Sequence, residues 1–245
     1  MLNQFSRTQL LLGAEAMEKL KGAHVAVFGI GGVGGYVCEA LVRSGVGAFD
    51  LVDDDKVCLT NLNRQIIATR KTIGKYKVEV MRDRILEINP DCDVRMHQCF
   101  YLPETADQFD FSTYDYVVDA VDTVTAKVTL VLEAQKAGVP IISCMGAGNK
   151  LDPSCLRIAD ITKTSVCPLA RAMRVSCKKK GIRHMTVAYS LEPMHPPVQP
   201  IAEESGRRKD IPGSTAFVPG AMGLLIASHV VRTLMAGDEP ARPEG

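Results

Sequence analysis

The stretch that decides the fold is VAVFGIGGVGGYVCEALVRSG, which runs from Val25 to Gly45. It opens with apolar, β-branched residues and ends with apolar side chains at helical spacing, so it predicts a strand, a turn and a helix. The turn holds Gly29, Gly31, Gly32 and Gly34. Missing side chains there let backbone amides and a helix N-terminus meet a phosphate. A tight packing turn is the alternative, and the strand-turn-helix context favours nucleotide binding.

Strands and helices alternate along most of the chain. Strands are expected at 24–28, 49–52, 94–98, 116–121, 139–144 and 186–190. Helices are expected at 10–20, 34–44, 75–88, 124–137, 167–180 and 219–235. This alternation predicts an α/β, Rossmann-like, doubly wound fold: a mostly parallel sheet with helices on both faces. The pattern loosens from Leu156, which predicts a less regular C-terminal extension.

Length and composition favour one domain that covers residues 1–245, because 46% hydrophobic residues suffice for one substantial core. We expect an N-terminal helix within 1–22. The segment 192–212 is rich in proline and charge and predicts a mobile loop, and 236–245 predicts a disordered tail.

Charge and cysteine usage exclude several classes of protein. The net charge is +1, so a polyanion would have to be met by a local basic patch. Eight cysteines without a C-x-x-C pair indicate reduced thiols and no paired-cysteine zinc site. The longest apolar run, 221–231, is too short for a membrane span. A soluble, cytoplasmic protein without a membrane partner is therefore expected.

Polar residues after the second predicted strand indicate which nucleotide is bound. Asp53 ends that strand, where a carboxylate accepts hydrogen bonds from a ribose, so an NAD-dependent dehydrogenase remains possible. The motifs TNLNRQ (60–65) and GKYK (74–77) then supply Asn61, Arg64, Gln65 and Lys77. Fixed cations stabilise the charge that develops when a triphosphate is attacked, whereas the phosphates of a bound dinucleotide do not react. Solvated surface charges are the alternative for Arg64 and Lys77.

An aspartate follows the predicted strand at 116–121. Asp122 ends the sequence DAVD, at the carboxyl end of a central parallel strand, where open α/β sheets bind ligands. A carboxylate beside phosphates is a suitable Mg²⁺ ligand. A cap for the helix that begins near Val124 is the competing role.

Basic residues gather in the C-terminal half. Arg171, Arg174 and Lys178 recur at helical spacing and are followed by Lys179, while Arg207 and Arg208 lie in the expected mobile loop. Together they would follow the phosphates of a nucleic acid, and a solvated helix face is the alternative.

Five motifs in fixed order, GIGGVG, DDDKV, TNLNRQ, GKYKVE and DAVD, carry a family resemblance. The chain resembles the superfamily of adenylating enzymes that activates ubiquitin-like proteins and sulfur carriers. The resemblance implies ATP and Mg as cofactors. Asp53 would hold the ribose with Asp55 beside it, Asn61, Arg64, Gln65 and Lys77 the phosphates, and Asp122 the magnesium.

The same resemblance extends to the N-terminus. Arg7, in FSRTQLLLG, matches an arginine that relatives place in the neighbouring subunit's ATP site. The resemblance therefore implies a homodimer and adds Arg7 to the catalytic residues Arg64, Lys77 and Asp122.

The C-terminal half narrows the resemblance. Residues 146–174 are similar to one branch of the superfamily, the tRNA threonylcarbamoyladenosine dehydratases, and the two zinc-binding C-x-x-C pairs of carrier-activating relatives are absent. This branch implies ATP-dependent adenylation and cyclisation of the threonylcarbamoyl carboxylate on the tRNA adenosine beside the anticodon. It also implies a tRNA partner and a cysteine desulfurase/sulfur-acceptor system as a further partner.

Other functions remain open at this point. They are adenylation of the C-terminal glycine of a ubiquitin-like sulfur carrier, an NAD-dependent dehydrogenase, and a nucleotide-gated binding module without turnover. Cys144 and Cys167 lie where a thiol could accept sulfur, although a buried structural thiol is the preferred interpretation of both.

Overall fold

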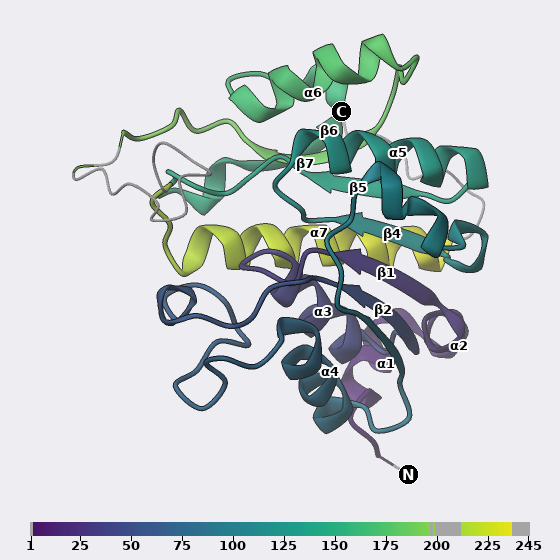
Figure 1. The fold of residues 1–245 in the computed structure, drawn as a ribbon. Helices are drawn as coiled ribbons and strands as arrows, with labels where there is room; N and C mark the ends of the chain where they lie inside the picture. Colours follow the sequence, from purple (N-terminus) through teal and green to yellow (C-terminus); the bar gives the residue numbers. More distant parts are fainter. Residues whose placement is uncertain (1, 197, 199–211, 237–245) are drawn as a thin grey trace.

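The structure is a computed structural model that describes residues 2–196, 198 and 212–236. The described residues form a sheet of seven strands in the order β3-β2-β1-β4-β5-β7-β6 (Figure 1). The strands are β1 His24–Phe28, β2 Ala48–Val52, β3 Asp93–His97, β4 Tyr116–Asp119, β5 Ile141–Cys144, β6 Leu156–Asp160 and β7 Thr186–Ser190. All neighbours pair in parallel except β6 and β7. The expected mostly parallel, Rossmann-like sheet is confirmed.

Helices cover both faces of this sheet. They are α1 Ser6–Leu12, α2 Ala14–Gly22, α3 Gly34–Ser44, α4 Lys77–Ile88, α5 Val124–Ala137, α6 Pro168–Lys179 and α7 Phe217–Ala236. One apolar core lies between the sheet and α3, α4 and α7. The second lies between the opposite face and α5, α6 and two 3₁₀ turns, η2 Pro103–Gln108 and η3 Phe111–Thr113. The molecule therefore has a three-layered, doubly wound α/β fold.

The topology places a crevice between β1 and β4. The chain leaves β1 toward β2 on one side and later enters β4 on the other, so the loops after these strands diverge and leave a ligand site. Directly after the strands, before they diverge, the two loops are in contact. A Cβ on Gly29, whose φ is +91°, would lie 2.7 Å from the Ala120 carbonyl oxygen. Glycine at this position is therefore required by both backbone conformation and space.

The N-terminal region differs from the single helix expected there. Gly13, with φ +87° and ψ 165°, separates α1 from α2. Its conformation is one that L side chains rarely adopt, so the chain turns at this glycine. Both helices lie within the range 1–22.

The C-terminal half contains more regular structure than the sequence suggested. β6, which was not expected, pairs antiparallel with β7 at the sheet edge. It is mostly half-buried, so its residues lack the uniform apolar run that marks a central parallel strand. Residue 197, most of the expected mobile loop (199–211 of 192–212) and all but the first residue of the expected tail (237–245 of 236–245) lie outside the described residues.

Helix α7 is longer than the apolar run 221–231 that the sequence indicated. Its 20 residues, with a hydropathy of 1.4, would by length and composition alone suffice to cross a membrane. In this fold α7 packs closely on α3: a Cβ on Gly223 would lie 2.6 Å from the Val33 carbonyl oxygen. Val218, Met222 and Ile226 of α7 are fully buried in the core. This is the packing of a core helix.

Candidate active site

The glycine turn between β1 and α3 is tightly built. A Cβ on Gly34, the first residue of α3, would lie 1.8 Å from the carbonyl oxygen of Gly29. Val33 precedes α3 without a side-chain cap, so no side chain competes with an anion at this helix N-terminus. The turn therefore brings bare backbone to the crevice, as phosphate binding requires.

An acidic group closes one side of the turn. The Asp53 carboxylate, at the end of β2, accepts hydrogen bonds from the backbone amides of Ile30, at 2.7 Å, and Asp55, at 2.9 Å. Lys77 Nζ lies 2.6 Å from the Asp55 carboxylate and 3.5 Å from that of Asp53. Burial raises the pKa of Asp53, and the Lys77 charge opposes this rise. Asp53, Asp55 and Lys77 are thus one cluster joined to the glycine turn through Ile30.

The TNLNRQ segment lies on the other side of the turn. The buried Asn61 accepts a hydrogen bond from the Cys58 amide at 3.1 Å, which shapes the 3₁₀ turn η1, Leu59–Asn61. Gln65 is also buried, and its Oε1 has no hydrogen-bond partner among the described residues. Its Nε2 would lie 3.9 Å from a Cβ on Gly31. An unsatisfied polar group beneath a glycine turn suits a polar ligand there.

Arg64 faces a cavity of about 550 Å³ that opens beside the turn. Its Nη1 donates hydrogen bonds to the Thr60 carbonyl oxygen and Asn63 Oδ1, both at 2.9 Å. Among the described residues no carboxylate lies within ion-pair distance of its guanidinium group. Asp122, which is exposed, lines the same cavity from the loop after β4. A cation and an oxygen donor for a metal ion therefore face one space next to the glycine turn.

The backbone of Pro212–Ser214 bridges this cavity. Gly213 exchanges hydrogen bonds with Asn149 on one wall, at 2.7 and 2.8 Å. The Ser214 carbonyl oxygen accepts a hydrogen bond from Asn63 Nδ2, next to Arg64, at 2.9 Å. Pro212, Gly213 and Ser214 line the cavity, and a more enclosed site holds less water at a reacting group.

A fully buried ion pair beneath the cavity escaped the sequence analysis. Lys127 Nζ lies 3.0 Å from Asp119 Oδ1 and donates to the Cys144 carbonyl oxygen at 2.7 Å. Both side chains have 0% exposure. The pair joins the ends of β4 and β5 to α5 and supports the loop that carries Asp122. The two residues are eight positions apart and match no recognised motif. They meet because α5, which follows β4, packs back against the sheet.

The structure brings together most, but not all, of the sequence-predicted site residues. Gly32, Arg64 and Asp122 line the cavity. Asn61 and Gln65 are buried and do not line it. Lys77 lies with Asp53 and Asp55 and is likewise not among the lining residues. Arg7 is exposed on α1 and is likewise absent from the cavity lining.

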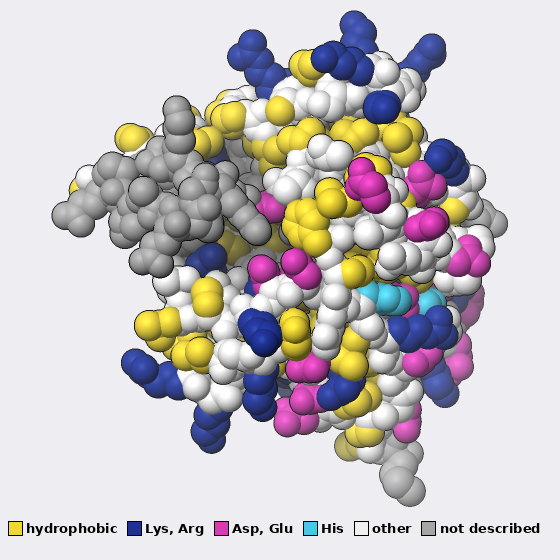
Figure 2. Space-filling view, in the orientation of Figure 1, with side chains coloured by type: hydrophobic (Ala, Val, Ile, Leu, Met, Phe, Trp, Pro, Cys, Tyr) yellow, Lys and Arg dark blue, Asp and Glu magenta, His cyan; other side chains and the backbone are white. Residues whose placement is uncertain are grey.

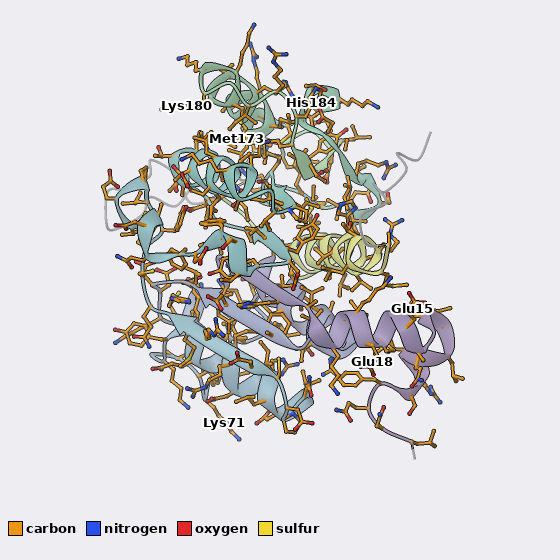
Figure 3. The ribbon with its side chains drawn as sticks, turned by 90° about the vertical axis from the view of Figure 1, so that its right-hand side faces the viewer. Glu15, Glu18, Lys71, Met173, Lys180 and His184 are labelled. Atoms are coloured by element: carbon orange, nitrogen blue, oxygen red, sulfur yellow. The ribbon has the colours of Figure 1, made fainter. Side chains whose placement is uncertain are left out.

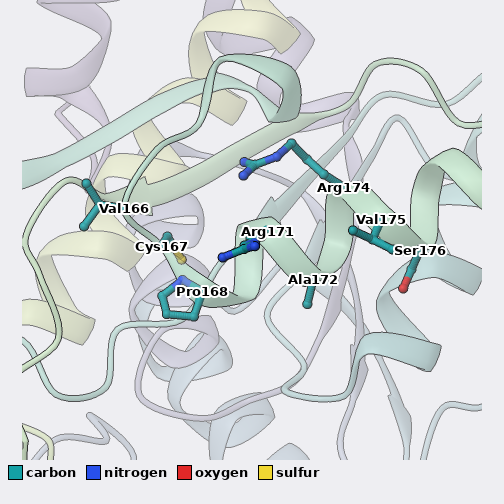
Figure 4. A pocket seen from close by; sticks show the side chains of 8 residues that line it. All are labelled: Val166, Cys167, Pro168, Arg171, Ala172, Arg174, Val175 and Ser176. Carbon is teal, nitrogen blue, oxygen red and sulfur yellow. The ribbon is translucent and has the colours of Figure 1, made fainter.

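The predicted basic patch lies on α6, beside the cavity. Arg171 and Arg174 line a second pocket of about 680 Å³, which shares Cys167 and Pro168 with the first (Figure 4). Arg174 donates to the carbonyl and hydroxyl oxygens of Thr164. Lys178 and Lys179 are exposed, whereas Arg207 and Arg208 lie outside the described residues.

Basic side chains form a local group at the α6 end of the molecule, although other Lys and Arg side chains lie elsewhere on the surface (Figure 2 and Figure 3). Basic side chains gather over α6 in the space-filling view (Figure 2). Lys180 and His184 lie at that end, whereas Glu15 and Glu18 project from α2 at a distance from it (Figure 3). The small net charge therefore conceals a local basic surface, which is what a polyanion needs.

The two cysteines singled out from the sequence are buried. Cys167 Sγ contacts the Met145 carbonyl oxygen at 3.4 Å. Burial raises the pKa of the Cys144 thiol, and this lowers the fraction of reactive thiolate. The geometry thus favours structural roles for both.

The fold and this site define a nucleotide-binding α/β protein whose phosphate site adjoins a partly covered, cation-lined cavity. The chain belongs to the ThiF family, whose model matches residues 5–244. It is 44% identical to the tRNA threonylcarbamoyladenosine dehydratase of Bacillus subtilis, over 99% of this chain and 98% of that protein.

Solved structures of one relative are similar throughout. The E. coli tRNA N6-threonylcarbamoyladenosine dehydratase in complex with ATP is 35% identical, with a TM-score of 0.86 over 95% of this chain and 94% of that chain. Its complex with AMP is 34% identical with a TM-score of 0.87 over the same shares. The likeness extends over nearly the whole chain and is not confined to the nucleotide-binding half.

Proposed function

We propose that this protein is an ATP-dependent tRNA-modifying enzyme that adenylates and cyclises the threonylcarbamoyl group on the adenosine beside the anticodon. The observation that carries the proposal is the cavity beside the glycine turn, which both Arg64 and Asp122 line. It occurs in a chain that matches an ATP-bound dehydratase over nearly its full length. A dinucleotide would not need this additional cation-lined space.

The reaction has two steps. A carboxylate oxygen of the threonylcarbamoyl group attacks the α-phosphorus of ATP, and the bond to pyrophosphate breaks. The carbamoyl group then attacks the activated acyl carbon, AMP leaves, and a ring remains with net loss of one water. Both nucleophiles belong to the substrate, so the protein has to position the reactants and neutralise charge.

The proposed roles follow the positions of the side chains. Asp53, held by the Ile30 amide, accepts the ribose hydroxyls, with Asp55 and Lys77 beside it. Arg64 neutralises the phosphates, and Asn61, Gln65 and Lys77 complete their surroundings. The Asp122 carboxylate suits Mg²⁺, which prefers oxygen ligands and commonly takes one or two carboxylates plus substrate phosphates. When bound, magnesium would reduce the charge on the phosphates under attack.

A homodimer is part of the proposal. The helix α1 has no buried residue, and Leu10 and Leu11 are 88% and 84% exposed. Two adjacent leucines on an amphipathic helix suit a second copy of the chain as partner. Arg7 lies on the same helix and would reach the phosphates of the neighbouring subunit.

The tRNA is proposed to lie over α6. Its exposed lysines, together with Arg171 at the mouth of the second pocket, would follow phosphates toward the cavity. Arg207 and Arg208 extend the same proposal. A cysteine desulfurase system as partner and a cytoplasmic location complete it.

The test is incubation of the protein with ATP, Mg²⁺ and tRNA that carries threonylcarbamoyladenosine. Pyrophosphate release and loss of one water from the modified nucleoside, measured by mass spectrometry, are the expected results. The control is the same tRNA without the modification. Release that depends instead on a ubiquitin-like carrier with a C-terminal glycine would overturn the proposal in favour of carrier activation.

A further inference from the structure

A buried lysine lines the same cavity as the glycine turn. Lys150 follows β5, is 4% exposed and lines the same cavity as Arg64 and Asp122. Its Nζ donates a hydrogen bond to the Glu192 carbonyl oxygen. None of the described carboxylates lies within ion-pair distance of this ammonium group. Burial of a charge without a counter-charge is unfavourable, so the site is suited to an anion.

The carboxylate of Glu192 forms its hydrogen bonds with groups other than Lys150. The Glu192 carboxylate accepts hydrogen bonds from the Leu151 and Asp152 amides, at 2.9 and 3.0 Å, and lies 2.7 Å from His195 Nε2. The His195 amide donates to the Asn149 carbonyl oxygen at 3.0 Å. These bonds hold the segment on both sides of Lys150. The lysine is therefore a fixed positive charge and not a flexible surface side chain.

The position of Lys150 indicates which anion this is. The proposed ribose ligand Asp53 follows β2, the glycine turn follows β1 and Asp122 follows β4. Lys150 follows β5, one strand further along the same edge. Arg64, whose Cγ would lie 3.4 Å from a Cβ on Gly32, is the cation at the glycine turn and is proposed to serve the phosphates. Lys150 is a second cation in the same cavity, apart from that turn. The second anion in an adenylation reaction is the attacking carboxylate, which approaches the α-phosphorus in line, opposite to the departing pyrophosphate.

We propose that Lys150 binds the carboxylate of the acyl substrate and holds it against the α-phosphate. The inference rests on the proposed function and adds the residue that recognises the substrate carboxylate. A lysine has three N–H donors, of which one serves Glu192, so two remain for the carboxylate oxygens. The ammonium also reduces the repulsion between two anions that have to meet.

The experiment compares two ligands and three proteins. The ligands are an anticodon stem-loop with the threonylcarbamoyl carboxylate and the same stem-loop with its methyl ester, bound in the presence of AMP so that no turnover occurs. The proteins are the wild type, Lys150→Gln, which retains a donor for Glu192 without the charge, and Lys150→Arg, which retains the charge. The exposed Lys71→Gln is the matched control.

We expect the wild type and Lys71→Gln to prefer the carboxylate by about 10- to 10²-fold, the value of a charged hydrogen bond. Lys150→Gln should lose this preference and Lys150→Arg should keep most of it, while ATP affinity and thermal midpoint stay as in the wild type. A preference that persists in Lys150→Gln overturns the inference. A loss of ATP affinity without loss of the preference also overturns it, because Lys150 would then serve a phosphate.

The results for the wild-type protein distinguish a failure of this inference from a failure of the proposed function. If the wild type prefers the carboxylate and removes water from the modified nucleoside, only the variants decide the role of Lys150. If the wild type prefers neither ligand and removes no water, the proposed function is overturned, and the inference that rests on it is overturned as well.

Discussion

Individual side chains at the crevice are constrained to very different degrees. Gly34 has no room for a Cβ, whereas a Cβ on Gly31 would meet only Gln65 Nε2 at 3.9 Å. Asp122 and Arg64 line the cavity, where their charge matters more than close packing. Two residue-scale predictions follow from this contrast between packing and chemistry.

Gly34→Ala should unfold the turn. Because its Cβ would lie 1.8 Å from the Gly29 carbonyl oxygen, backbone has to move, and we expect a lower thermal midpoint and no ATP binding. Gly31→Ala is the matched control and should keep its thermal midpoint. Equal midpoints for the two variants would show that the turn is not packed as described.

Asp122→Asn should affect catalysis without affecting stability. The side chain is exposed, so the free energy of unfolding should change by no more than about 0.5 kcal/mol. Loss of charge at the proposed magnesium site should lower the rate of pyrophosphate release by about 10²-fold or more. A magnesium titration provides the readout: a variant with wild-type rate and magnesium dependence would remove Asp122 from the metal site.

Two buried polar clusters join secondary-structure elements. One lies beneath the cavity, and the other joins β1, β2 and β3 of the same sheet. The Asp119–Lys127 pair connects β4, β5 and α5. Asp50 of β2 accepts hydrogen bonds from His24 of β1, His97 of β3 and Tyr114, at 2.8, 2.9 and 2.9 Å. Such clusters are stable only while every partner is present.

Lys127→Met should be strongly destabilising. The change leaves the fully buried Asp119 without its counter-charge, which typically costs about 3–5 kcal/mol of unfolding free energy. Urea denaturation measures it. Adding Asp119→Asn to Lys127→Met should recover part of the loss, and Lys136→Met, at an exposed ion pair, should have little effect. A Lys127→Met protein as stable as Lys136→Met would contradict the role of the pair.

Acid should weaken the cluster around Asp50. Burial raises the pKa of Asp50, but hydrogen bonds from His24, His97 and Tyr114 outweigh burial and hold the pKa well below its ordinary value of 3.8. A lowered folded-state pKa stabilises the fold above the unfolded-state pKa, and this contribution is lost as pH falls below it. The unfolding free energy should therefore fall below about pH 4 in the wild type. Asp50→Asn should be less stable at neutral pH and should show a shallower acid limb.

At the scale of the whole molecule, the proposed dimer surface and the proposed tRNA surface lie apart. Figure 1 places α1 and α6 at opposite ends of the fold. A second copy on α1 would therefore leave the basic face of α6 open to a polyanion. This separation permits one protein to be both dimeric and tRNA-binding.

Leu10→Glu combined with Leu11→Glu should produce a monomer. Both side chains are almost fully exposed in the single chain, so the substitutions should leave its thermal midpoint unchanged. Analytical ultracentrifugation gives the oligomeric state, and Leu224→Glu on the exposed side of α7 is the control. We also expect slower pyrophosphate release, since Arg7 would no longer reach a partner. An unchanged sedimentation coefficient would place the interface elsewhere.

Local patterns in the sequence determined the parallel sheet, the glycine turn and most helix boundaries. Strand β1, helices α3 and α5 and strand β7 occur as predicted, because glycine stops, β-branched runs and helical spacing act within a few residues. The motifs that indicated ATP chemistry are local for the same reason. The edge strand β6 was missed because its five residues, LRIAD, show neither a continuous apolar run nor a strict alternation of apolar and polar residues.

Only the tertiary structure decided which side chains share a space. It brought Lys150, which follows Asp122 by 28 residues, to the same cavity and paired Asp119 with Lys127. It placed His24 and His97 beside Asp50. It also set Lys77 among carboxylates instead of in the cavity lining. The physical reason is that hydrogen bonds and ion pairs depend on distance in space, which crossovers between parallel strands make independent of distance along the chain.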